Sequence, residues 1–245
     1  MTYKNVVFDL DDTLYDHLLP FKRSVQSCFP SVNIASISDI YTRFRYWSDV
    51  AFPKYTKHLI SIEELRIFRC QKTMAEFGLP NVTEEEAINF QKDYEKELDR
   101  ITLIPTVKYL LDLLVENHIP IGLLTNGPVD LQTKKLINLG ALAYFNSDNI
   151  LISQSTGYNK PQRQIFDIAA EKFDFNPEKT LFIGDTFTND IEGSFNAGWV
   201  PVWFNHRKRN IPKGKENIDY FAVNSSEELL KLVKIIFNLT KKDSN

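Results

Sequence analysis

Two acidic residues directly after a short apolar segment are the first candidates for chemistry. Asp9 and Asp11 follow Val6–Phe8, a segment that predicts a buried strand. Open α/β sheets bind their ligands at the carboxyl ends of such strands. Two carboxylates buried close together repel each other unless a cation offsets their charge, so the pair predicts a nucleophile and a proton donor around one hard metal ion. A plain helix N-cap is the alternative, since Asp12 and Thr13 are good capping residues.

A hydroxyl and a lysine further along the chain have the properties of an anion site. Thr125 and Asn126 follow the apolar segment Ile119–Leu124. A hydroxyl with backbone N–H groups in a turn forms a cradle for an anion, although Asn-Gly is also a common turn. Lys160 precedes Pro161, where a helix is expected to begin. A positive charge is unfavourable at that end of a helix, so Lys160 is either a solvated lysine or the partner of carboxylates and a phosphoryl group.

A second pair of acids, Asp185 and Asp190, lies beyond another apolar segment, Leu181–Ile183. Asp190 could simply start the next helix, because acidic residues are favoured in the first turn. Asp185 is harder to explain in that way, since it comes directly after an apolar strand and Gly184. It is therefore a further candidate for a ligand-binding carboxylate at a strand end.

The elements that must position these residues alternate between strands and helices. Short β-rich segments recur along the chain, and amphipathic helical patterns lie between several of them, which predicts a mostly parallel, three-layer α/β sheet core. The expected strands are Val6–Phe8, Ile119–Leu124, Ile150–Ile152, Leu181–Ile183, Val200–Phe204 and Tyr220–Val223. The expected helices are Val107–Asn117, Pro161–Phe173 and Ser226–Phe237, the last opened by a capping box of Ser225 and Glu228.

The long segment 16–100 breaks this alternation. A connection of that length inside a compact domain is seldom a plain loop. Its capping-box patterns Ser61-x-x-Glu64 and Thr83-x-x-Glu86 predict helices instead. We therefore expect a core domain of residues 1–15 and 101–245 and an inserted all-helical cap domain of residues 16–100, placed over the strand ends as a lid.

Composition excludes several classes of protein. The chain has 29 Lys and Arg against 32 Asp and Glu, so a nucleic-acid polymer is not an expected partner. The two cysteines, Cys28 and Cys70, form no CxxC pair, which argues against a disulfide scaffold and a structural zinc site. The sequence has no secretory leader pattern and no apolar segment of about 18–20 residues, so we expect a cytoplasmic protein with no membrane partner. Either a monomer or a homodimer is compatible with this composition.

Together the four clusters resemble the haloacid dehalogenase (HAD) superfamily. Its pattern is Asp-x-Asp-x-Thr after the first strand, Thr or Ser after the second core strand, a lysine opening a later helix, and Gly-Asp-x-x-x-x-Asp. The resemblance runs from Thr2 to about Val223 and implies a Rossmann-like core, with the inserted segment similar to the family's helical cap of the first type. The matching residues, in order, are Asp9, Asp11, Thr13, Thr125, Lys160, Gly184, Asp185 and Asp190.

The resemblance implies a Mg²⁺-dependent phosphatase that forms an aspartyl-phosphate. Asp9 would be the nucleophile, and Asp11 would protonate the leaving alcohol and then deprotonate the attacking water. Mg²⁺ would bind Asp9, the backbone carbonyl of Asp11 and Asp185. Asp190 would hydrogen-bond the water ligands of the metal without binding the metal itself.

The remaining clusters would bind the transferring group. By the same resemblance, Thr125 and the N–H of Asn126 would hold the phosphoryl group, and Lys160 would neutralise Asp9 and the developing charge. The acid at position 11 favours a phosphatase over a dehalogenase, because a halide leaves without a proton. Residues 125–128, 153–161 and 184–198 resemble the nucleoside 5′-monophosphate phosphatase-like subgroup, so the expected partner is a small phosphorylated metabolite.

Other functions stay open at this point. A phosphosugar phosphatase or a phosphomutase would use the same residues, and a haloacid dehalogenase or a non-catalytic binding protein on this fold is less compatible with the complete set. Substrate choice is expected to come from the cap segment Arg43–Trp47, where arginines alternate with aromatic residues. Arg45 and Trp47 are candidates for contacts with the leaving group, although aromatic residues at this spacing also pack between helices.

Overall fold

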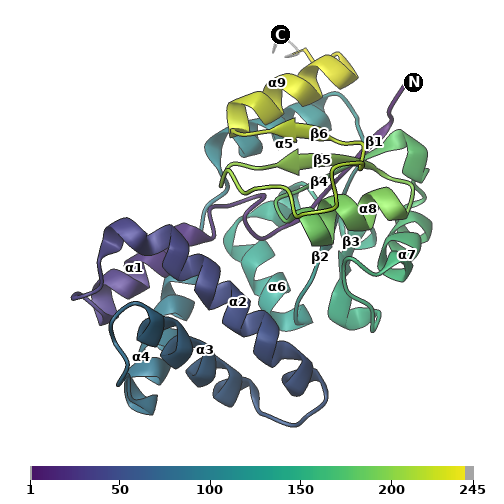
Figure 1. The fold of residues 1–245 in the computed structure, drawn as a ribbon. Coiled ribbons are helices and arrows are strands. Elements are labelled where there is room, and N and C mark those ends of the chain that lie inside the picture. Colours follow the sequence, from purple (N-terminus) through teal and green to yellow (C-terminus); the bar gives the residue numbers. More distant parts are fainter. Residues whose placement is uncertain (1, 241–245) are drawn as a thin grey trace. The chain divides into compact units, whose positions relative to one another are not determined.

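Parallel strands form one sheet in the computed structural model, which describes residues 2–240. Within this part of the chain the sheet has six strands in the order β3-β2-β1-β4-β5-β6, and every neighbouring pair is parallel (Figure 1). The predicted parallel α/β core is confirmed. The strands are β1 (Asn5–Phe8), β2 (Ile121–Thr125), β3 (Ile150–Ile152), β4 (Thr180–Gly184), β5 (Val200–Phe204) and β6 (Phe221–Val223).

Helices cover both faces of this sheet. Val7 and Phe182 point from β1 and β4 into an apolar cluster with Phe166 of α7. Side chains alternate along a strand, so Phe8 points the other way, where it meets Phe145 edge-on. Helices α5 and α9 pack against each other on that second side (Figure 1). The helices of this part are α5 (Pro105–Glu116), α6 (Val129–Asn138), α7 (Arg163–Phe173), α8 (Gly193–Asn196) and α9 (Ser226–Phe237).

The strand order reverses between β1 and β4. Strands β2 and β3 extend the sheet on one side of this pair, and β5 and β6 extend it on the other. Ligands of open α/β sheets bind at such a switch point, beyond the carboxyl ends of the two central strands. The residues that follow Phe8 and Gly184 are therefore at the favoured position for a site.

Two local predictions were wrong in detail. Helix α7 begins at Arg163 and not at Pro161, because the amide of Asn126 bonds both the N–H and the C=O of Lys160 and holds that residue outside the helix. At the start of α9, Ser225 accepts from the N–H of Glu228 as expected. The carboxylate of Glu228, however, accepts from the N–H of Asn224, so the capping box is not reciprocal.

The chain divides into two compact units. A core unit contains the residues up to Asp16 and from Thr102 onward, and a helical unit contains His17–Ile101. Both boundaries lie one residue after those expected from the sequence. Each unit has its own apolar core.

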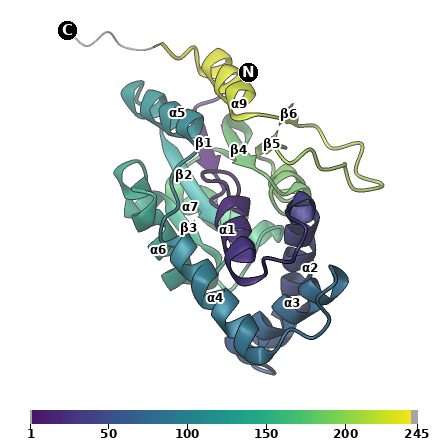
Figure 2. The ribbon, with the colours of Figure 1, turned by 90° about the vertical axis from the view of Figure 1, so that its left-hand side faces the viewer.

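Within the described residues, the helical unit contains four α-helices and one short 3-10 helix, Ile34–Ser36 (Figure 2). Its core is rich in aromatic residues, with Phe21, Phe44, Phe90 and Tyr94 all buried and in mutual edge-on, tilted or stacked contact. The predicted capping boxes of Ser61 and Thr83 are both present, at the starts of α3 and α4. The helices are α1 (Leu18–Cys28), α2 (Ile37–Thr56), α3 (Ile62–Glu76) and α4 (Glu84–Leu98).

Candidate active site

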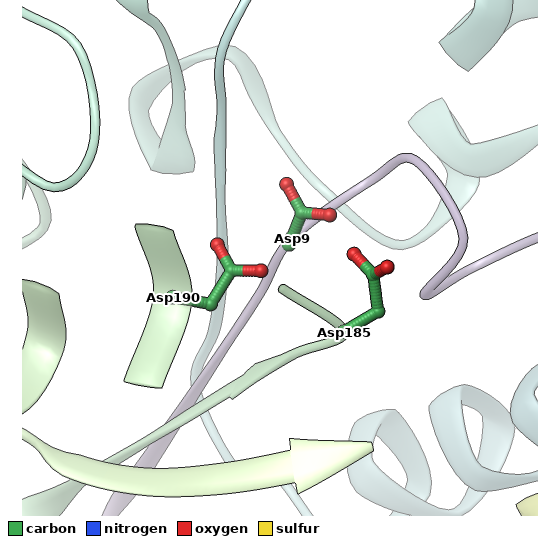
Figure 3. Close-up of side chains that lie close together, drawn as sticks. All are labelled: Asp9, Asp185 and Asp190. Atoms are coloured by element: carbon green, nitrogen blue, oxygen red, sulfur yellow. The ribbon is translucent and has the colours of Figure 1, made fainter. Parts of the chain in front are cut away.

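Three carboxylates meet at the switch point of the core unit. Asp9 follows β1 and Asp185 follows β4, and the two strands pair in register with Phe8 beside Ile183. Asp190 comes from a π-helical turn, Phe187–Glu192, and each of the three residues offers an oxygen within 4.8 Å of the others (Figure 3). All three are buried. Oxygen ligands of this type are the ones that Mg²⁺ prefers in proteins.

Gly184 allows Asp190 to come this close. A Cβ atom at position 184 would lie 2.4 Å from the Cβ and Cγ atoms of Asp190, which is shorter than any allowed contact. The π-helical turn directs the carboxylate of Asp190 back toward β4, where it accepts from the N–H of Thr186 at 2.9 Å. Isolated π-helical turns are common at functional sites, and here the turn adds a third carboxylate to the strand ends.

Lys160 is the ammonium group that bonds two of these carboxylates. Its Nζ donates to Asp9 Oδ1 and to Asp190 Oδ1, each at 2.6 Å. The lysine is 4% exposed, so it is not the solvated residue that its sequence position allowed. Asn126 fixes its backbone by the paired bonds described above, with the amide nitrogen of the side chain at 3.0 Å and the oxygen at 2.9 Å.

The site carries more negative charge than its own cations neutralise. Burial, together with the charges of Asp190 and Asp11, raises the pKa of Asp9 to about 7 despite the opposing effect of Lys160. Burial and the charge of Asp12 raise the pKa of Asp185 to about 6. Burial also raises the pKa of Asp190, against the effect of Lys160. Since a bound cation would relieve all of these costs, the donor set fits a divalent metal ion.

Burial alone would lower the pKa of Lys160, but the charges of Asp190 and Asp9 raise it above its ordinary value. The lysine is therefore held in its charged form, as a partner of a nucleophilic carboxylate or a phosphoryl group would need to be.

Asp11 lies in a second polar cluster, built from helix α6. Lys135 Nζ contacts both carboxylate oxygens of Asp11, at 2.7 and 2.9 Å, and Tyr15 donates its hydroxyl to the same carboxylate. Gln132 Nε2 lies 3.0 Å from Asp11 Oδ2 and 2.6 Å from Thr125 Oγ1. Gln132 therefore links the first and second sequence clusters.

The hydrogen bond from Gln132 leaves the Thr125 hydroxyl able to donate. Its hydroxyl oxygen accepts from Gln132, so the hydroxyl hydrogen stays available for an acceptor such as a phosphoryl oxygen. Asp11 does not belong to the group of three carboxylates described above. Its side chain thus lies outside the group of candidate metal ligands.

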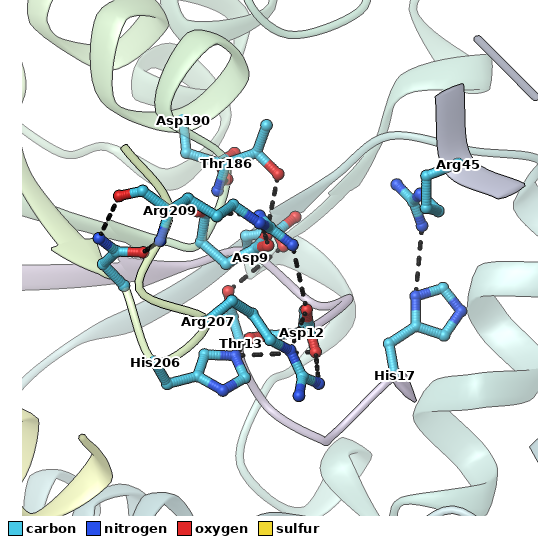
Figure 4. A network of polar contacts seen from close by, with 12 residues as sticks. Asp9, Asp12, Thr13, His17, Arg45, Thr186, Asp190, His206, Arg207 and Arg209 are labelled. Atoms are coloured by element: carbon cyan, nitrogen blue, oxygen red, sulfur yellow. Dashed lines mark hydrogen bonds and ion pairs between the residues drawn. The ribbon is translucent and has the colours of Figure 1, made fainter. Parts of the chain in front are cut away.

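Several residues at the site were missed by the sequence analysis. Gln132 and Lys135 are three residues apart on one face of α6, and a buried polar residue in an amphipathic helix was a usable signal. Arg207 and Arg209, in the segment after β5, bond Asp12 (Figure 4), and Arg209 also bonds Asp185. Nothing in the sequence marks these arginines except that they lie in a short basic segment, 207–209.

The helical unit holds the two residues proposed for substrate contacts in different surroundings. Arg45 Nη1 lies 3.2 Å from His17 Nδ1 (Figure 4). Trp47 donates its indole N–H to Glu76 at 2.9 Å and meets Phe68 edge-on at 5.7 Å between ring centres. These contacts favour a packing role for Trp47, whereas Arg45 bonds a polar partner.

A family model of haloacid dehalogenase-like hydrolases matches residues 3–198, and the chain belongs to this family. The resemblance inferred from the four sequence clusters is thereby confirmed. Among similar proteins, the HAD-hydrolase YfnB of Bacillus subtilis is 25% identical over 95% of this chain and 96% of its own. Two proteins named pyrimidine 5′-nucleotidases are also similar. PynA of Streptococcus pneumoniae is 28% identical over 91% of this chain and 92% of its own, and YjjG of Escherichia coli is 27% identical over 87% and 91%.

Solved structures agree on the fold. The crystal structure of YfnB bound to magnesium has a TM-score of 0.70 at 23% identity and covers 97% of this chain and 100% of that chain. A dehalogenase in an intermediate complex has a TM-score of 0.74 at 17% identity, with 94% and 97% covered. Among the described residues, no helix has the length and apolar character needed to cross a membrane.

Proposed function

We propose that this protein is a Mg²⁺-dependent phosphatase that hydrolyses small phosphomonoesters through a phosphoryl-Asp9 intermediate. The observation that carries the proposal is the position of Asp9, which is buried at the switch point between Lys160 and the other two carboxylates of the site. An isolated carboxylate would not be stable there, and a nucleophile that must meet a charged phosphoryl group needs these neighbours.

In the first step, a carboxylate oxygen of Asp9 attacks phosphorus and the bond from phosphorus to the leaving oxygen breaks. Asp11 gives its proton to that oxygen, so an alcohol leaves. In the second step, Asp11 takes a proton from water as the water attacks phosphorus. The bond between phosphorus and Asp9 then breaks, which releases inorganic phosphate and restores both acids.

The other residues of the site position and neutralise the phosphoryl group. Thr125 has a free hydroxyl hydrogen for a phosphoryl oxygen, since its oxygen is bonded by Gln132. Lys160 offsets the charge that develops next to Asp9. Phosphoryl transfer depends mainly on such positioning and electrostatic stabilisation.

Asp9, Asp185 and the backbone carbonyl of Asp11 would hold Mg²⁺, with Asp190 behind them. When bound, the ion would neutralise charge on the phosphoryl oxygens and on the carboxylates that face them. Both carboxylate oxygens of Asp190 already accept hydrogen bonds, from Lys160 and from the N–H of Thr186. Asp185 is bonded to the same extent, by the hydroxyl of Thr186 and by Arg209, so the outer role proposed for Asp190 rests on the resemblance to the family and not on this bonding.

The substrate proposed first is a nucleoside 5′-monophosphate with a pyrimidine base. Support comes from the two relatives named pyrimidine 5′-nucleotidases, which align with most of this chain. The helical unit would act as a cap that selects the leaving group, because the residues around Asp9 account for the phosphoryl group only. A phosphosugar phosphatase or a phosphomutase remains the alternative.

Phosphate release by the purified protein with Mg²⁺, measured on a panel of phosphorylated metabolites, tests both the proposed reaction and the proposed substrate. We expect CMP, UMP or dTMP to give the highest kcat/KM, and chelation to abolish turnover. Asp9→Asn is the matched control for contaminating phosphatases. A preference for sugar phosphates would replace the nucleotidase assignment, and full activity after exhaustive chelation would contradict the metal requirement.

A further inference from the structure

The residue next to Asp11 is held in an unusual way. Asp12 is 2% exposed and adopts a left-handed backbone conformation, with φ of 65°. This conformation is unfavourable for residues with a Cβ, although Asp tolerates it better than most. The turn places Asp12 between two residues of the motif, Asp11 and Thr13. Whatever holds Asp12 therefore also sets the direction of the Asp11 carbonyl and of the chain beyond Asp9.

Arg207 holds the carboxylate of Asp12 by two points. Its Nε lies 3.0 Å from Oδ2 and its Nη2 lies 2.6 Å from Oδ1, which is the fork geometry of a bidentate ion pair (Figure 4). Arg207 also bonds Asp16, the last residue of the core unit before the helical unit. His206 Nε2 lies 2.9 Å from the backbone oxygen of Asp12. Three contacts from two adjacent residues thus fix this turn.

Arg209 connects the same turn to the other strand end. Its Nη1 donates to Asp185 Oδ2 at 2.6 Å and lies 3.3 Å from the backbone oxygen of Asp185. Its Nη2 lies 3.4 Å from Asp12 Oδ2. Trp203, in the preceding strand β5, donates its indole N–H to the backbone oxygen of Asp185 at 2.9 Å. One segment of chain therefore contacts both loops that carry candidate metal ligands.

We propose that Arg207 and Arg209 are positioning residues that fix the loops after β1 and β4 in the arrangement that binds the metal ion. This inference rests on the proposed Mg²⁺-dependent phosphatase function. The carboxylates of Asp12 and Asp185 are buried, and ion pairs that hold buried carboxylates contribute little to stability, since well-packed apolar residues stabilise a fold as well or better. A two-point guanidinium contact, in contrast, specifies the orientation of a carboxylate and of the backbone attached to it.

Whether Arg207→Gln weakens or strengthens Mg²⁺ binding distinguishes a positioning role of Arg207 from a purely electrostatic one. Removing the guanidinium takes one positive charge away from Asp12 and from the metal site, so charge alone would strengthen the binding of a cation. Loss of positioning would weaken it. Residues that support metal ligands without touching the metal typically contribute about 10–100-fold to affinity or activity. We therefore expect the Mg²⁺ dissociation constant of Arg207→Gln to rise about tenfold or more.

The measurement is the thermal unfolding temperature of the full chain as a function of Mg²⁺ concentration, without substrate, which gives the apparent affinity. Lys213→Gln is the matched control, because Lys213 is exposed in the same segment and its loss removes the same charge. We expect that control to bind Mg²⁺ as the parent does. In a turnover assay, Arg207→Gln should lower kcat at saturating Mg²⁺ more than it raises KM for a small phosphate.

Unchanged or tighter Mg²⁺ binding by Arg207→Gln, in a parent that binds Mg²⁺ and releases phosphate, would overturn this inference alone. A parent that neither binds Mg²⁺ nor releases phosphate would overturn the proposed function with it. If Arg207→Gln does not fold, Arg207→Lys decides, since lysine keeps the charge but cannot make the planar two-point contact. Weaker Mg²⁺ binding by Arg207→Lys supports positioning, and parent-like binding refutes it.

A double-mutant cycle with Asp12→Asn tests whether Arg207 acts through Asp12. If it does, the two changes together should weaken Mg²⁺ binding no more than the larger single effect. Independent, multiplying losses would mean that Arg207 acts by another route and would contradict the proposed contact.

Discussion

At the scale of single residues, the two acids of the first motif have different surroundings although they are two positions apart. Asp9 is buried against Lys160, and its pKa is raised to about 7, chiefly by burial. Asp11 instead bonds Lys135, Gln132 and Tyr15. This separation supports the different roles proposed for the two carboxylates, because one lies among the candidate metal ligands and the other does not.

Replacing each acid by its amide should therefore give different defects. Asp9→Asn should abolish turnover and the phosphorylated intermediate, because an amide is a poor nucleophile. Asp11→Asn keeps the shape and the backbone carbonyl but cannot exchange a proton, and we expect a loss of about 10²–10⁴-fold with alkyl phosphates. Steady-state kinetics with an alkyl phosphate and with p-nitrophenyl phosphate provides the comparison. The loss of kcat/KM, which reports the first step, should be smaller for p-nitrophenyl phosphate than for the alkyl phosphate, because p-nitrophenol leaves without a proton. Equal losses for the two substrates would refute the role of Asp11 as proton donor.

At the scale of elements, the end of β4 and the turn that follows form one unit of structure. The π-helical turn brings Asp190 back against Gly184, and the N–H of Thr186 bonds its carboxylate. The lack of a side chain at position 184 is thus a requirement of the site. It is not a matter of backbone freedom, since Gly184 is not among the residues with positive φ.

Gly184→Ala should separate Asp190 from the other two carboxylates. The added methyl group would lie 2.4 Å from carbon atoms of Asp190, and overpacking of this kind costs about 1–3 kcal/mol. We expect a lower unfolding temperature and a large loss of Mg²⁺ protection against heat. Retention of both properties would show that the turn relaxes without disturbing the carboxylates.

The carboxylates at the strand ends also predict how the stability of the metal-free protein depends on pH. The pKa of Asp9 is about 7 and that of Asp185 about 6 in the folded protein, against 3.8 for a free side chain. Between these values the folded state binds more protons than the unfolded state. The free energy of unfolding should therefore fall as pH rises from 3.8 toward 7, and this contribution is complete above the folded pKa values.

In our proposal Mg²⁺ replaces those protons, so its stabilising effect should follow the opposite trend. We expect Mg²⁺ to raise the unfolding temperature more at about pH 7.5 than at about pH 5. Calorimetric or fluorescence melts with and without Mg²⁺ at both pH values test this. Equal protection at both values would mean that these carboxylates are not where the ion binds.

At the scale of the whole molecule, the chain consists of two units that are joined where the first strand ends and where the second α/β segment begins. The core unit contains every residue to which a chemical step is assigned. Our proposal that the helical unit acts as a cap gives that unit the choice of substrate and not the chemistry. Substitutions in the helical unit should then change specificity while the reaction itself stays intact.

Arg45→Ala and Trp47→Ala should distinguish a residue that selects the substrate from a residue that packs inside the helical unit. Trp47 contacts Glu76 and Phe68 inside the helical unit, so its loss should lower the unfolding temperature. Arg45→Ala should lower kcat/KM for the preferred substrate and leave hydrolysis of acetyl phosphate nearly unchanged, with little effect on the unfolding temperature. If Arg45→Ala treats all substrates as the parent does, specificity resides in other residues of the helical unit.

The sequence by itself determined the parallel core, the inserted helices and the acids at the strand ends. These features are local: an apolar segment followed by a polar residue, or a capping residue three positions before a glutamate, is visible in a few neighbouring residues. The same applies to Lys160, although its burial was not visible. Its helix was placed too early because the bonds from Asn126 come from a distant part of the chain.

Only the tertiary structure revealed which residues support the acids of the site. Gln132 and Lys135 meet Asp11 because β2 lies beside β1 in the sheet. Arg207 and Arg209 reach Asp12 and Asp185 because β5 lies beside β4, so the segment after β5 ends at the same edge as the metal-site loops. Strand order is set by the packing of the whole sheet, and no short stretch of sequence contains it.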